Sequence, residues 1–415
     1  MKDTAEAAQT LEQGEKIGHT EILWTDQEPS SNRVVSGKVP HILYVIDQIC
    51  QVGGAERVLL EMIRRLPRDH FRCSVITFRT EPGLKALENV YSPLRVLPLR
   101  RTYDISAIRT ALLIRDLIRR ENVSIVHTFF ETSDLWAAPI ARLSGCPVLV
   151  SSRRDTGILR TRKHHLAYPI VNRLFDRVLT VSEKVRAYAL NHDHLPPERV
   201  ETLYNGVDLE ALDAKAAEVD ARLSLGLKAT SRVISTLANI RHVKGIDVLA
   251  RAAARVCFAC PDAVFLVVGG VLEPEAFREL QSLVDSLGIK DNFRFLGAMS
   301  NPYPVLAASD IFCLPSRTEG FSNALIEAMG SRLACVATRV GGNAEALTEG
   351  VNGFLVESED ADAMGNRLLR LLRDPNLRRG MGQAARQTVE SHFSMSAMMA
   401  RLTGIYQELL AAKNV

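Results

Sequence analysis

The sequence predicts an α/β protein made of two Rossmann-like, doubly wound domains. Apolar strand-like runs alternate with helical periodicity from Pro40 onward, the alternation restarts at Arg232, and a charged, Ala-rich segment at 209–230 separates the two series. Strands that alternate with helices favour a parallel sheet, because parallel neighbours need a long crossover connection. A chain of 415 residues is long enough for two or three domains with their own cores.

The first series begins with a strand at 42–46, a turn at Gly53-Gly54 and a helix at 55–66. Its further strand-like runs are 74–78, 94–98, 125–128, 147–151 and 177–181, with helical periodicity between them, for example at 105–120. The second series has strands at 232–237, 263–268, 292–296, 311–315 and 334–338, and helices at 247–260, 275–287, 324–330 and 361–372. The final segment, 396–410, has apolar residues at helical spacing.

We therefore expect a flexible leader at 1–38, an N-terminal domain at 39–210, a C-terminal domain at 211–395 and a terminal helix at 396–415. The first 35 residues carry seven acidic and three basic side chains and no apolar run typical of a secretory signal. No apolar run elsewhere approaches the roughly 20 residues of a membrane span.

Composition narrows the class of protein. The net charge of +3 is too small to indicate a nucleic-acid partner, and we expect none. The seven cysteines are scattered and odd in number, which suits buried thiols in a reducing compartment better than a disulfide framework. We expect a cytoplasmic protein.

The most informative motif is a pair of glutamates, Glu319 and Glu327, eight positions apart. Glu319 is expected on the loop after the strand at 311–315, and Glu327 about one turn into the next helix. Between them, Ser322 and Asn323 suit a tight turn and a helix N-cap. A helix N-terminus can hold a phosphate, and a carboxylate beside it can accept hydrogen bonds from sugar hydroxyls. The combination suits a nucleotide-sugar.

This segment closely resembles the Glu-x7-Glu motif of the retaining glycosyltransferases of family four, which have the GT-B fold. The resemblance extends from about His41 to the C-terminus. It implies that Glu327 holds the nucleotide ribose, that Glu319 contacts the sugar ring, and that the intervening Phe321, Ser322 and Asn323 border the donor. It also implies that the terminal helix crosses back to the N-terminal domain. The alternative is an ordinary amphipathic helix with two solvated glutamates.

A second candidate lies at 239–245, where Asn239 to Gly245 follows a strand and opens a helix. Arg241 and Lys244 are expected to bracket a diphosphate, Arg through its planar fork and Lys as a point charge. The family pattern has an arginine five residues before this lysine, and here Asn239 holds that position. The alternative is a solvated basic helix start.

Three further candidate binding positions lie at or just after the ends of predicted strands. Gly53-Gly54 resembles the glycine loop that faces the donor phosphates; it lacks the G-x-G-x-x-G fingerprint, which disfavours a dinucleotide oxidoreductase, and a plain tight turn is the alternative. Gly269 ends a strand where the nucleobase could pack. His127 ends the run 125–127, and the resemblance places a donor-contacting histidine there; a structural histidine is the alternative.

A basic segment spans 153–163, with one acidic residue, Asp155, inside it. This segment is interpreted either as a solvated loop or as a patch that binds the acceptor or a membrane surface. Its cationic residues are Arg153, Arg154, Arg160, Arg162 and Lys163.

No metal or other cofactor is expected besides the nucleoside-diphosphate sugar that serves as donor substrate. Asp360-Ala361-Asp362 looks like the Asp-x-Asp of metal-dependent transferases, but it lies at an expected helix start and reads as a cap.

The residues and the resemblance together predict a retaining glycosyltransferase that acts on a glycan or lipid-linked hydroxyl. Its expected setting is cell-surface polysaccharide or glycoconjugate synthesis, with possible peripheral contact to the cytoplasmic membrane face. The alternatives are a nucleotide-sugar 2-epimerase on the same fold and a non-catalytic nucleotide-sugar-binding protein.

Overall fold

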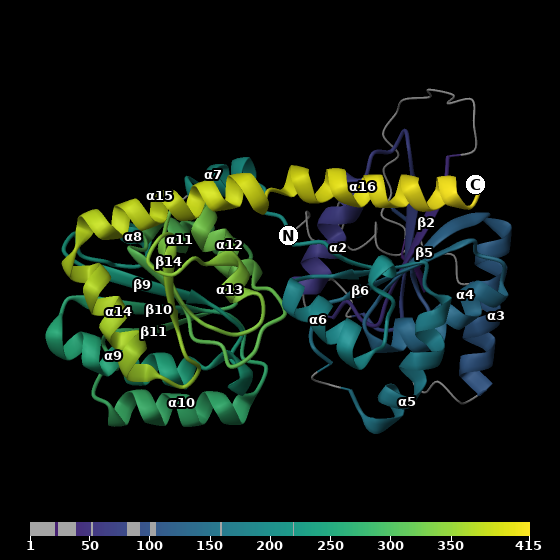
Figure 1. The fold of residues 1–415 in the computed structure, drawn as a ribbon. Coiled ribbons are helices and arrows are strands. Elements are labelled where there is room, and N and C mark those ends of the chain that lie inside the picture. Colours follow the sequence, from purple (N-terminus) through teal and green to yellow (C-terminus); the bar gives the residue numbers. More distant parts are fainter. Residues whose placement is uncertain are drawn as a thin grey trace, which may run out of the picture. The chain divides into compact units, whose positions relative to one another are not determined.

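The computed structural model describes residues 21–23, 39–50, 53–80, 92–99, 105–157, 160–218 and 220–415 (Figure 1). The described chain forms two compact units. Unit 1 comprises the described residues up to Val181 together with Val185–Leu203 and Met399–Val415; unit 2 comprises Ser182–Lys184 and Tyr204–Met398. The last residues of the chain thus belong to the same unit as the first strands.

Unit 1 contains a sheet with the strand order β1-β4-β3-β2-β5-β6-β7-β8. Neighbouring strands are parallel except β1 and β4. The strands are β1 (Glu21–Leu23), β2 (His41–Ile46), β3 (Arg72–Thr77), β4 (Leu94–Val96), β5 (Val123–Phe129), β6 (Val148–Arg153), β7 (Arg177–Thr180) and β8 (Val200–Thr202). β1 lies within the expected flexible leader, the rest of which falls outside the described residues.

The helices of unit 1 cover this sheet (Figure 1). They are α2 (Gly54–Arg65), α3 (Ile105–Arg120), the π-helix η2 (Ser133–Ala137), α4 (Ala138–Leu143), α5 (Arg162–Val171), the 3-10 turns η3 (Asn172–Leu174) and η4 (Pro197–Arg199), α6 (Glu183–His192) and α16 (Met395–Ala412). Side chains of α3, α4 and α5 share one core with Leu43 and Val45 of β2. Side chains alternate between the faces of a strand, so Tyr44 points to the other face, where its hydroxyl meets that of Tyr406 at 3.1 Å.

Unit 2 contains a parallel sheet with the order β11-β10-β9-β12-β13-β14. Its strands are β9 (Arg232–Leu237), β10 (Ala263–Val268), β11 (Phe293–Gly297), β12 (Ile311–Leu314), β13 (Ala334–Thr338) and β14 (Gly353–Val356). Its helices are α7 (Leu209–Ala216), α8 (Ala221–Ser224), the 3-10 turn η5 (His242–Lys244), α9 (Ile246–Ala259), α10 (Pro274–Ser286), α11 (Tyr303–Ala308), α12 (Asn323–Gly330), α13 (Asn343–Ala346), α14 (Ala361–Arg373) and α15 (Pro375–His392).

Both sheets are doubly wound around a central pair of strands. In unit 2 the chain order reverses between β9 and β12, and in unit 1 between β2 and β5. Ligands of open α/β sheets bind at the carboxyl edge beside such a switch point. The topology therefore directs attention to the loops that follow β9 and β12, and to those that follow β2 and β5.

The prediction of two parallel, Rossmann-like domains is confirmed, because both sheets have this topology. Several short elements were not predicted. β8 and β14 have only three and four residues, too few for a clear apolar run. The charged join at 209–230 contains α7 and α8. α15 begins at Pro375 after a tight break, where the Asp374 carboxylate accepts hydrogen bonds from the N–H groups of Asn376 and Leu377.

The central strands are buried on both faces, as parallel strands between helical layers usually are. Every residue of β2, β6 and β10 is buried. This explains the continuous apolar runs at 42–46 and 263–268, whereas β6 ends in the buried polar residues Ser151, Ser152 and Arg153. Within the described part of the chain, no helix is both long and apolar enough to cross a membrane.

Candidate functional site

At the switch point of unit 2, the loops after β9 and β12 bring Lys244 and Glu319 together. Lys244 Nζ donates to Glu319 Oε1 at 2.7 Å, and Ser316 Oγ donates to the same oxygen at 2.6 Å. The Lys244 side chain is 27% exposed and that of Glu319 only 9%. Two residues predicted from separate motifs therefore form one charged pair at the edge where ligands bind.

Helix α12 begins at Asn323, one residue earlier than the predicted start. Ser322 is its N-cap: the hydroxyl accepts a hydrogen bond from the N–H of Leu325 at 3.3 Å. The Asn323 side-chain oxygen accepts from the Asn205 amide at 2.6 Å. This start orients the positive end of α12 toward the loop that carries Glu319.

Glu327 lies in the second turn of α12 and is buried. The Tyr303 hydroxyl donates to Glu327 Oε1 at 3.4 Å. Sequence reasoning did not single out Tyr303, because it precedes the glutamate by 24 residues on a different helix, α11.

Phe321 packs into an aromatic cluster. Its ring centroid lies 5.2 Å from that of Tyr204 and 5.3 Å from that of Phe393. The side chain is 7% exposed, so most of its surface is used in packing that supports the start of α12.

Arg241 and Lys244 have different partners in this structure. Arg241 Nε donates to Glu273 Oε1 at 3.2 Å, and the backbone N–H of His242 donates to Glu273 Oε2 at 2.8 Å. The His242 hydrogen bond, followed by that of Arg241, lowers the pKa of Glu273. Asn239, at the position where the family pattern has arginine, accepts a hydrogen bond from the N–H of Gly270 at 2.9 Å. In this structure, Arg241 therefore does not join Lys244 in the expected pair of diphosphate-binding cations.

Arg317 joins the two loops of the site and was not predicted. Its two Nη atoms each lie 2.8 Å from a carboxylate oxygen of Asp247. Nη1 also donates to the carbonyl of His242, and the backbone N–H of Arg317 donates to the carbonyl of Val243 at 2.9 Å. Burial opposes ionisation of Asp247, but its contacts with Arg317 outweigh that effect and lower the pKa of the carboxyl. Arg317 therefore fixes the turn that carries Lys244.

Two glycines permit close backbone approaches here. A Cβ on Gly269 would lie 2.1 Å from the carbonyl oxygen of Ala238. Close packing between the ends of β10 and β9 therefore explains why this position is a glycine. Gly341 has a φ of +51°, and a Cβ there would lie 1.9 Å from the carbonyl oxygen of Glu319. The second contact lets the loop after β13 pack against the backbone of Glu319.

In unit 1, Gly53 is the N-cap of α2 and Gly54 its first residue. The Glu56 carboxylate folds back toward this turn, since a Cβ on Gly53 would lie 2.6 Å from Glu56 Oε2. Burial raises the pKa of Glu56, and hydrogen bonds to the backbone of this turn together with the charge of Arg154 partly offset that effect. An acidic side chain thus lies at the helix start that was expected to face donor phosphates.

The structure corrects the predicted position of His127 at the end of its strand. The strand does not end there, because β5 continues to Phe129, and the His127 side chain is fully buried. Its Nδ1 lies 2.6 Å from the Tyr406 hydroxyl and its Nε2 lies 2.8 Å from the Ser152 hydroxyl. Burial, followed by the charge of Arg154, lowers the pKa of His127 to about 3. The ring is therefore neutral near pH 7 and ties α16 to the sheet.

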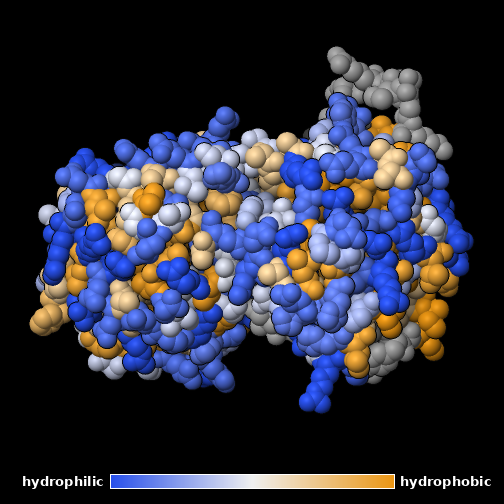
Figure 2. Space-filling view, in the orientation of Figure 1, coloured by the Kyte–Doolittle hydropathy of each residue, from blue (hydrophilic) through white to orange (hydrophobic). Residues whose placement is uncertain are grey.

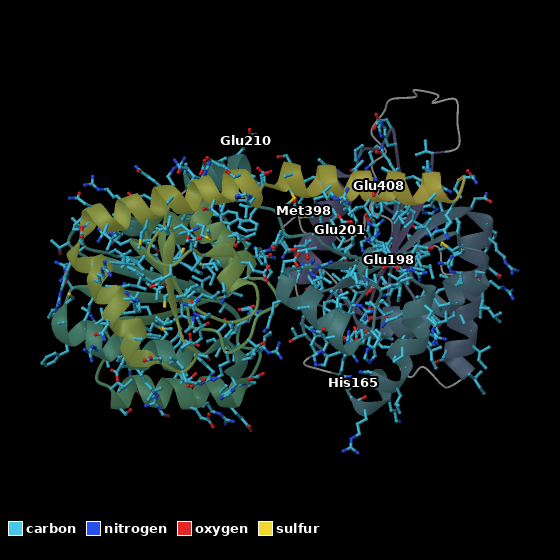
Figure 3. All side chains as sticks on the ribbon, in the orientation of Figure 1. His165, Glu198, Glu201, Glu210, Met398 and Glu408 are labelled. Atoms are coloured by element: carbon cyan, nitrogen blue, oxygen red, sulfur yellow. The ribbon has the colours of Figure 1, made fainter. Side chains whose placement is uncertain are left out.

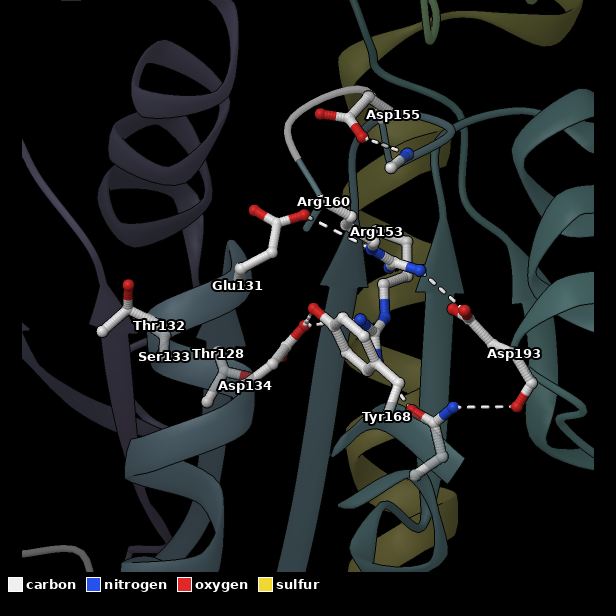
Figure 4. A network of polar contacts seen from close by, with 12 residues as sticks. Thr128, Glu131, Thr132, Ser133, Asp134, Arg153, Asp155, Arg160, Tyr168 and Asp193 are labelled. Atoms are coloured by element: carbon white, nitrogen blue, oxygen red, sulfur yellow. Dashed lines mark hydrogen bonds and ion pairs between the residues drawn. The ribbon is translucent and has the colours of Figure 1, made fainter. Parts of the chain in front are cut away.

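The basic segment is also corrected, because it is not a continuous cationic surface (Figure 4). Arg153 and Arg160 are 3% exposed and flank the Tyr168 ring, with guanidinium carbons 4.2 and 4.0 Å from its centroid. Arg153 pairs with Asp134 at 2.8 Å and Arg160 with Asp193 at 2.6 Å.

The other three members of that segment differ in exposure. Burial lowers the pKa of Arg154 to about 10, with the charge of Glu56 opposing the shift. Arg162 and Lys163, at the start of α5, are exposed. The cavity beside the buried network holds only about 10 Å³, room for one water at most. A larger cavity of about 730 Å³ lies between α9 and α14 and contains none of the predicted site residues.

Asp360 is the N-cap of α14 as predicted, and its side chain accepts from the N–H of Ala363 at 2.8 Å. Across the described ranges, no group of three or more His, Cys, Asp or Glu side chains could hold a metal ion. All seven cysteines are free, and five of them are buried.

Two Rossmann-like units, with an acidic and basic pair beside a helix N-terminus, fit the GT-B class of glycosyltransferase. The model of Glycosyltransferase Family 4 matches residues 52–211, and that of Glycosyl transferases group 1 matches residues 220–388. D-inositol 3-phosphate glycosyltransferase of Kribbella flavida is 31% identical over 368 residues, 80% of this chain and 85% of the relative. The chain belongs to the group 1 and family 4 glycosyltransferases and is a glycosyltransferase.

Other relatives differ in acceptor. N-acetyl-alpha-D-glucosaminyl L-malate synthase of Bacillus anthracis is 29% identical over 86% of this chain and 95% of its own. A galactosyltransferase of Escherichia coli, named for UDP-Gal and alpha-D-GlcNAc-diphosphoundecaprenol, is 25% identical over 87% of this chain and 95% of its own. Among solved structures, Anabaena HepE in complex with UDP has a TM-score of 0.78 at 20% identity, covering 89% of this chain and 100% of its own.

Proposed function

We propose that the protein is a retaining glycosyltransferase that moves a sugar from a nucleoside-diphosphate sugar to a hydroxyl group of a glycan or glycolipid. The observation that carries the proposal is the pair of Lys244 and Glu319 beside the N-terminus of α12, at the switch point of unit 2. That edge is where α/β sheets bind nucleotides. The UDP in the HepE structure supports the same class of donor.

The roles combine what the family resemblance implies with the charge of each group. Lys244 and the positive end of α12 stabilise the diphosphate as negative charge grows on it during bond cleavage. Glu319 accepts hydrogen bonds from sugar hydroxyls, and Glu327, held by Tyr303, accepts them from the ribose. Arg241 reaches the diphosphate only if it leaves Glu273. His127, which is buried, acts on the fold of unit 1 rather than on the sugar.

Retention in this family is explained by attack on the same face as the departing phosphate. A phosphate oxygen then helps to remove the proton of the acceptor hydroxyl. The relatives' names carry L-malate, D-inositol 3-phosphate and a diphosphoundecaprenol. All three are anionic hydroxyl compounds or lipid-linked sugars, so we infer an acceptor of this kind. Of the three names, only the diphosphoundecaprenol supports the setting in cell-surface glycoconjugate synthesis that we propose.

Product analysis separates this proposal from its alternatives. The purified chain is incubated with a nucleotide-sugar and a candidate acceptor, and the products are resolved by chromatography and NMR. A glycoside with retained anomeric configuration plus free nucleoside diphosphate supports the proposal. An epimerised nucleotide-sugar without acceptor indicates a 2-epimerase, and binding without any product indicates a non-catalytic module.

The donor is found by a thermal-shift screen over nucleotide-sugars, because a ligand that binds only the folded form raises the melting temperature. With the donor known, turnover is measured in excess chelator. We expect activity to persist, since Lys244 and the helix dipole supply the positive charge. Complete loss that a divalent cation reverses contradicts a metal-free mechanism.

A further inference from the structure

The exposed large apolar side chains of unit 1 gather on one layer of helices. α3 carries Ile105, Ile108 and Leu112, which recur at helical spacing and form one strip. α4 ends in Leu143, which is 83% exposed. Figure 2 shows such side chains as an orange patch over α3.

α5 continues this pattern. Leu166 and Ile170, four residues apart and 77% and 70% exposed, share one side of the helix. His165, labelled in Figure 3, also lies on its exposed surface. α3 packs against α4, α4 packs against η3, and η3 continues directly from α5, so the three helices form one layer.

The other layer of unit 1 lacks such residues. Of the described residues of α2 and of α16 from Met399 onward, none is an exposed large apolar side chain. Apart from the terminal Val415, the large apolar side chains exposed in described unit 1 all lie on α3, α4 and α5. Single exposed leucines need no explanation, but strips collected on one layer indicate an interaction surface.

The charge of the same layer favours an anionic partner. α3, α4 and α5 together contain seven arginines and lysines against one acidic residue, Asp116, a net charge of +6 in a chain whose total is +3. The exposed basic residues on α3 and α5 are Arg109, Arg119, Arg120, Arg162 and Lys163.

An apolar strip with a rim rich in arginine and lysine is typical of helices that lie in the interface of an anionic bilayer. We propose that the outer face of α3, α4 and α5 docks unit 1 on an anionic phospholipid surface. The inference deepens the proposed function and rests on it in one respect: such a surface presents lipid-linked acceptors to the enzyme.

The docking face differs from the basic segment that the sequence singled out. Arg153 and Arg160 are buried in ion pairs and contribute nothing to it, whereas Arg162 and Lys163 belong to it. Leu166 and Ile170 supply the apolar contact that a purely cationic loop lacks.

The test is sedimentation of the full chain with vesicles of phosphatidylglycerol and phosphatidylcholine, against vesicles of phosphatidylcholine alone. We expect binding to the anionic vesicles at low salt and release as salt screens the charges. The double variant Leu166→Ser/Ile170→Ser should lower the partition coefficient about tenfold or more, a change that corresponds to about 1.4 kcal/mol.

A matched control comes from unit 2. Leu223 and Phe258 are 80% and 93% exposed, and the double variant Leu223→Ser/Phe258→Ser should bind vesicles like the wild type. If the α5 variant does not fold, as judged by circular dichroism, Arg162→Glu/Lys163→Glu serves instead and should abolish binding to anionic vesicles.

Three results overturn the proposal: no binding of the wild type to anionic vesicles at low salt, unchanged binding of the α5 variant, or equal loss in the unit 2 control. Light scattering that shows a dimer, which the α5 variant makes monomeric, assigns the face to a second copy instead. Nucleotide-sugar binding, measured by calorimetry without vesicles, tests the proposed function separately. Intact vesicle docking without donor binding contradicts only that function.

Discussion

Lys244 and Glu319, 75 positions apart in the sequence, form a direct ion pair with 2.7 Å between Nζ and Oε1. The pair joins the loop after β9 to the loop after β12. A donor diphosphate must therefore compete with Glu319 for the lysine. Because the Glu319 side chain is only 9% exposed, removal of the lysine charge leaves its carboxylate without its cationic partner.

Replacement of Lys244 by alanine should lower turnover about 10²-fold or more, the usual effect of removing a group that stabilises developing negative charge. Turnover is measured at saturating donor. Lys290, which is 78% exposed in the same unit, provides the control, and Lys290→Ala should leave turnover unchanged. Near wild-type turnover of a folded Lys244→Ala enzyme would remove Lys244 from the proposed chemistry.

Glu327→Ala should weaken the affinity for the parent nucleotide by about 1.5–3 kcal/mol, the range for hydrogen bonds that involve a charged group. Isothermal titration calorimetry gives the affinity directly. Glu275, whose side chain is 88% exposed in unit 2, is the control. An unchanged affinity in a folded variant rules out the ribose assignment.

Arg317→Lys tests whether the arginine positions Lys244. Lysine keeps the charge but cannot reproduce the two-pronged contact with Asp247. We expect turnover to fall about tenfold or more, since small misplacements of catalytic groups are costly, while nucleotide affinity changes less. Arg339→Lys, at an exposed pair with Glu357, is the control. Equal losses in turnover and in affinity would point to a general structural role instead.

The lowered pKa of His127 should make the stability of unit 1 depend on pH. Its folded pKa, about 3, is below the ordinary value of 6.5, so the unfolded chain binds the extra proton first. The contribution of the neutral His127 ring to the free energy of unfolding is fully present above pH 6.5 and is lost as the pH falls toward 3. At pH 5 the loss is about 2 kcal/mol.

Urea unfolding at pH 7.5 and pH 5 measures this dependence. His127→Gln should reduce the difference between the two pH values, whereas His165→Gln, at an exposed position, should not. His41, with a pKa lowered to about 4 chiefly by burial, contributes in the same direction and remains in both variants. If His127→Gln keeps the full difference, the imidazole does not titrate as its burial implies.

Arg160→Ala should destabilise unit 1 by about 3–5 kcal/mol, because it leaves the buried Asp193 carboxylate without its ion-pair partner. Arg162→Ala, two positions along, should change the free energy of unfolding by about 0.5 kcal/mol or less. Both are measured by urea unfolding. Similar small effects for the two substitutions would mean that Arg160 is solvated, as in the loop interpretation of this segment.

The sequence by itself determined the architecture and the chemistry-bearing loops. Apolar runs of five or six residues between amphipathic helices predict buried parallel strands, because only such strands are covered on both faces. The helix at 105–120 has the predicted bounds, and Ser322 and Asp360 are caps as their residue types predict. Local patterns suffice for these features because the physics behind them is local.

Only the tertiary structure decided which side chains meet. Glu319 pairs with Lys244, Arg241 with Glu273 and Glu327 with Tyr303, and each pair joins separate elements. Burial is likewise non-local: His127, expected to contact the donor, and Arg160, expected in a solvated loop or an acceptor patch, both have buried side chains inside unit 1. A sequence specifies the charge of a side chain, whereas its exposure and partners depend on elements that are distant in the chain.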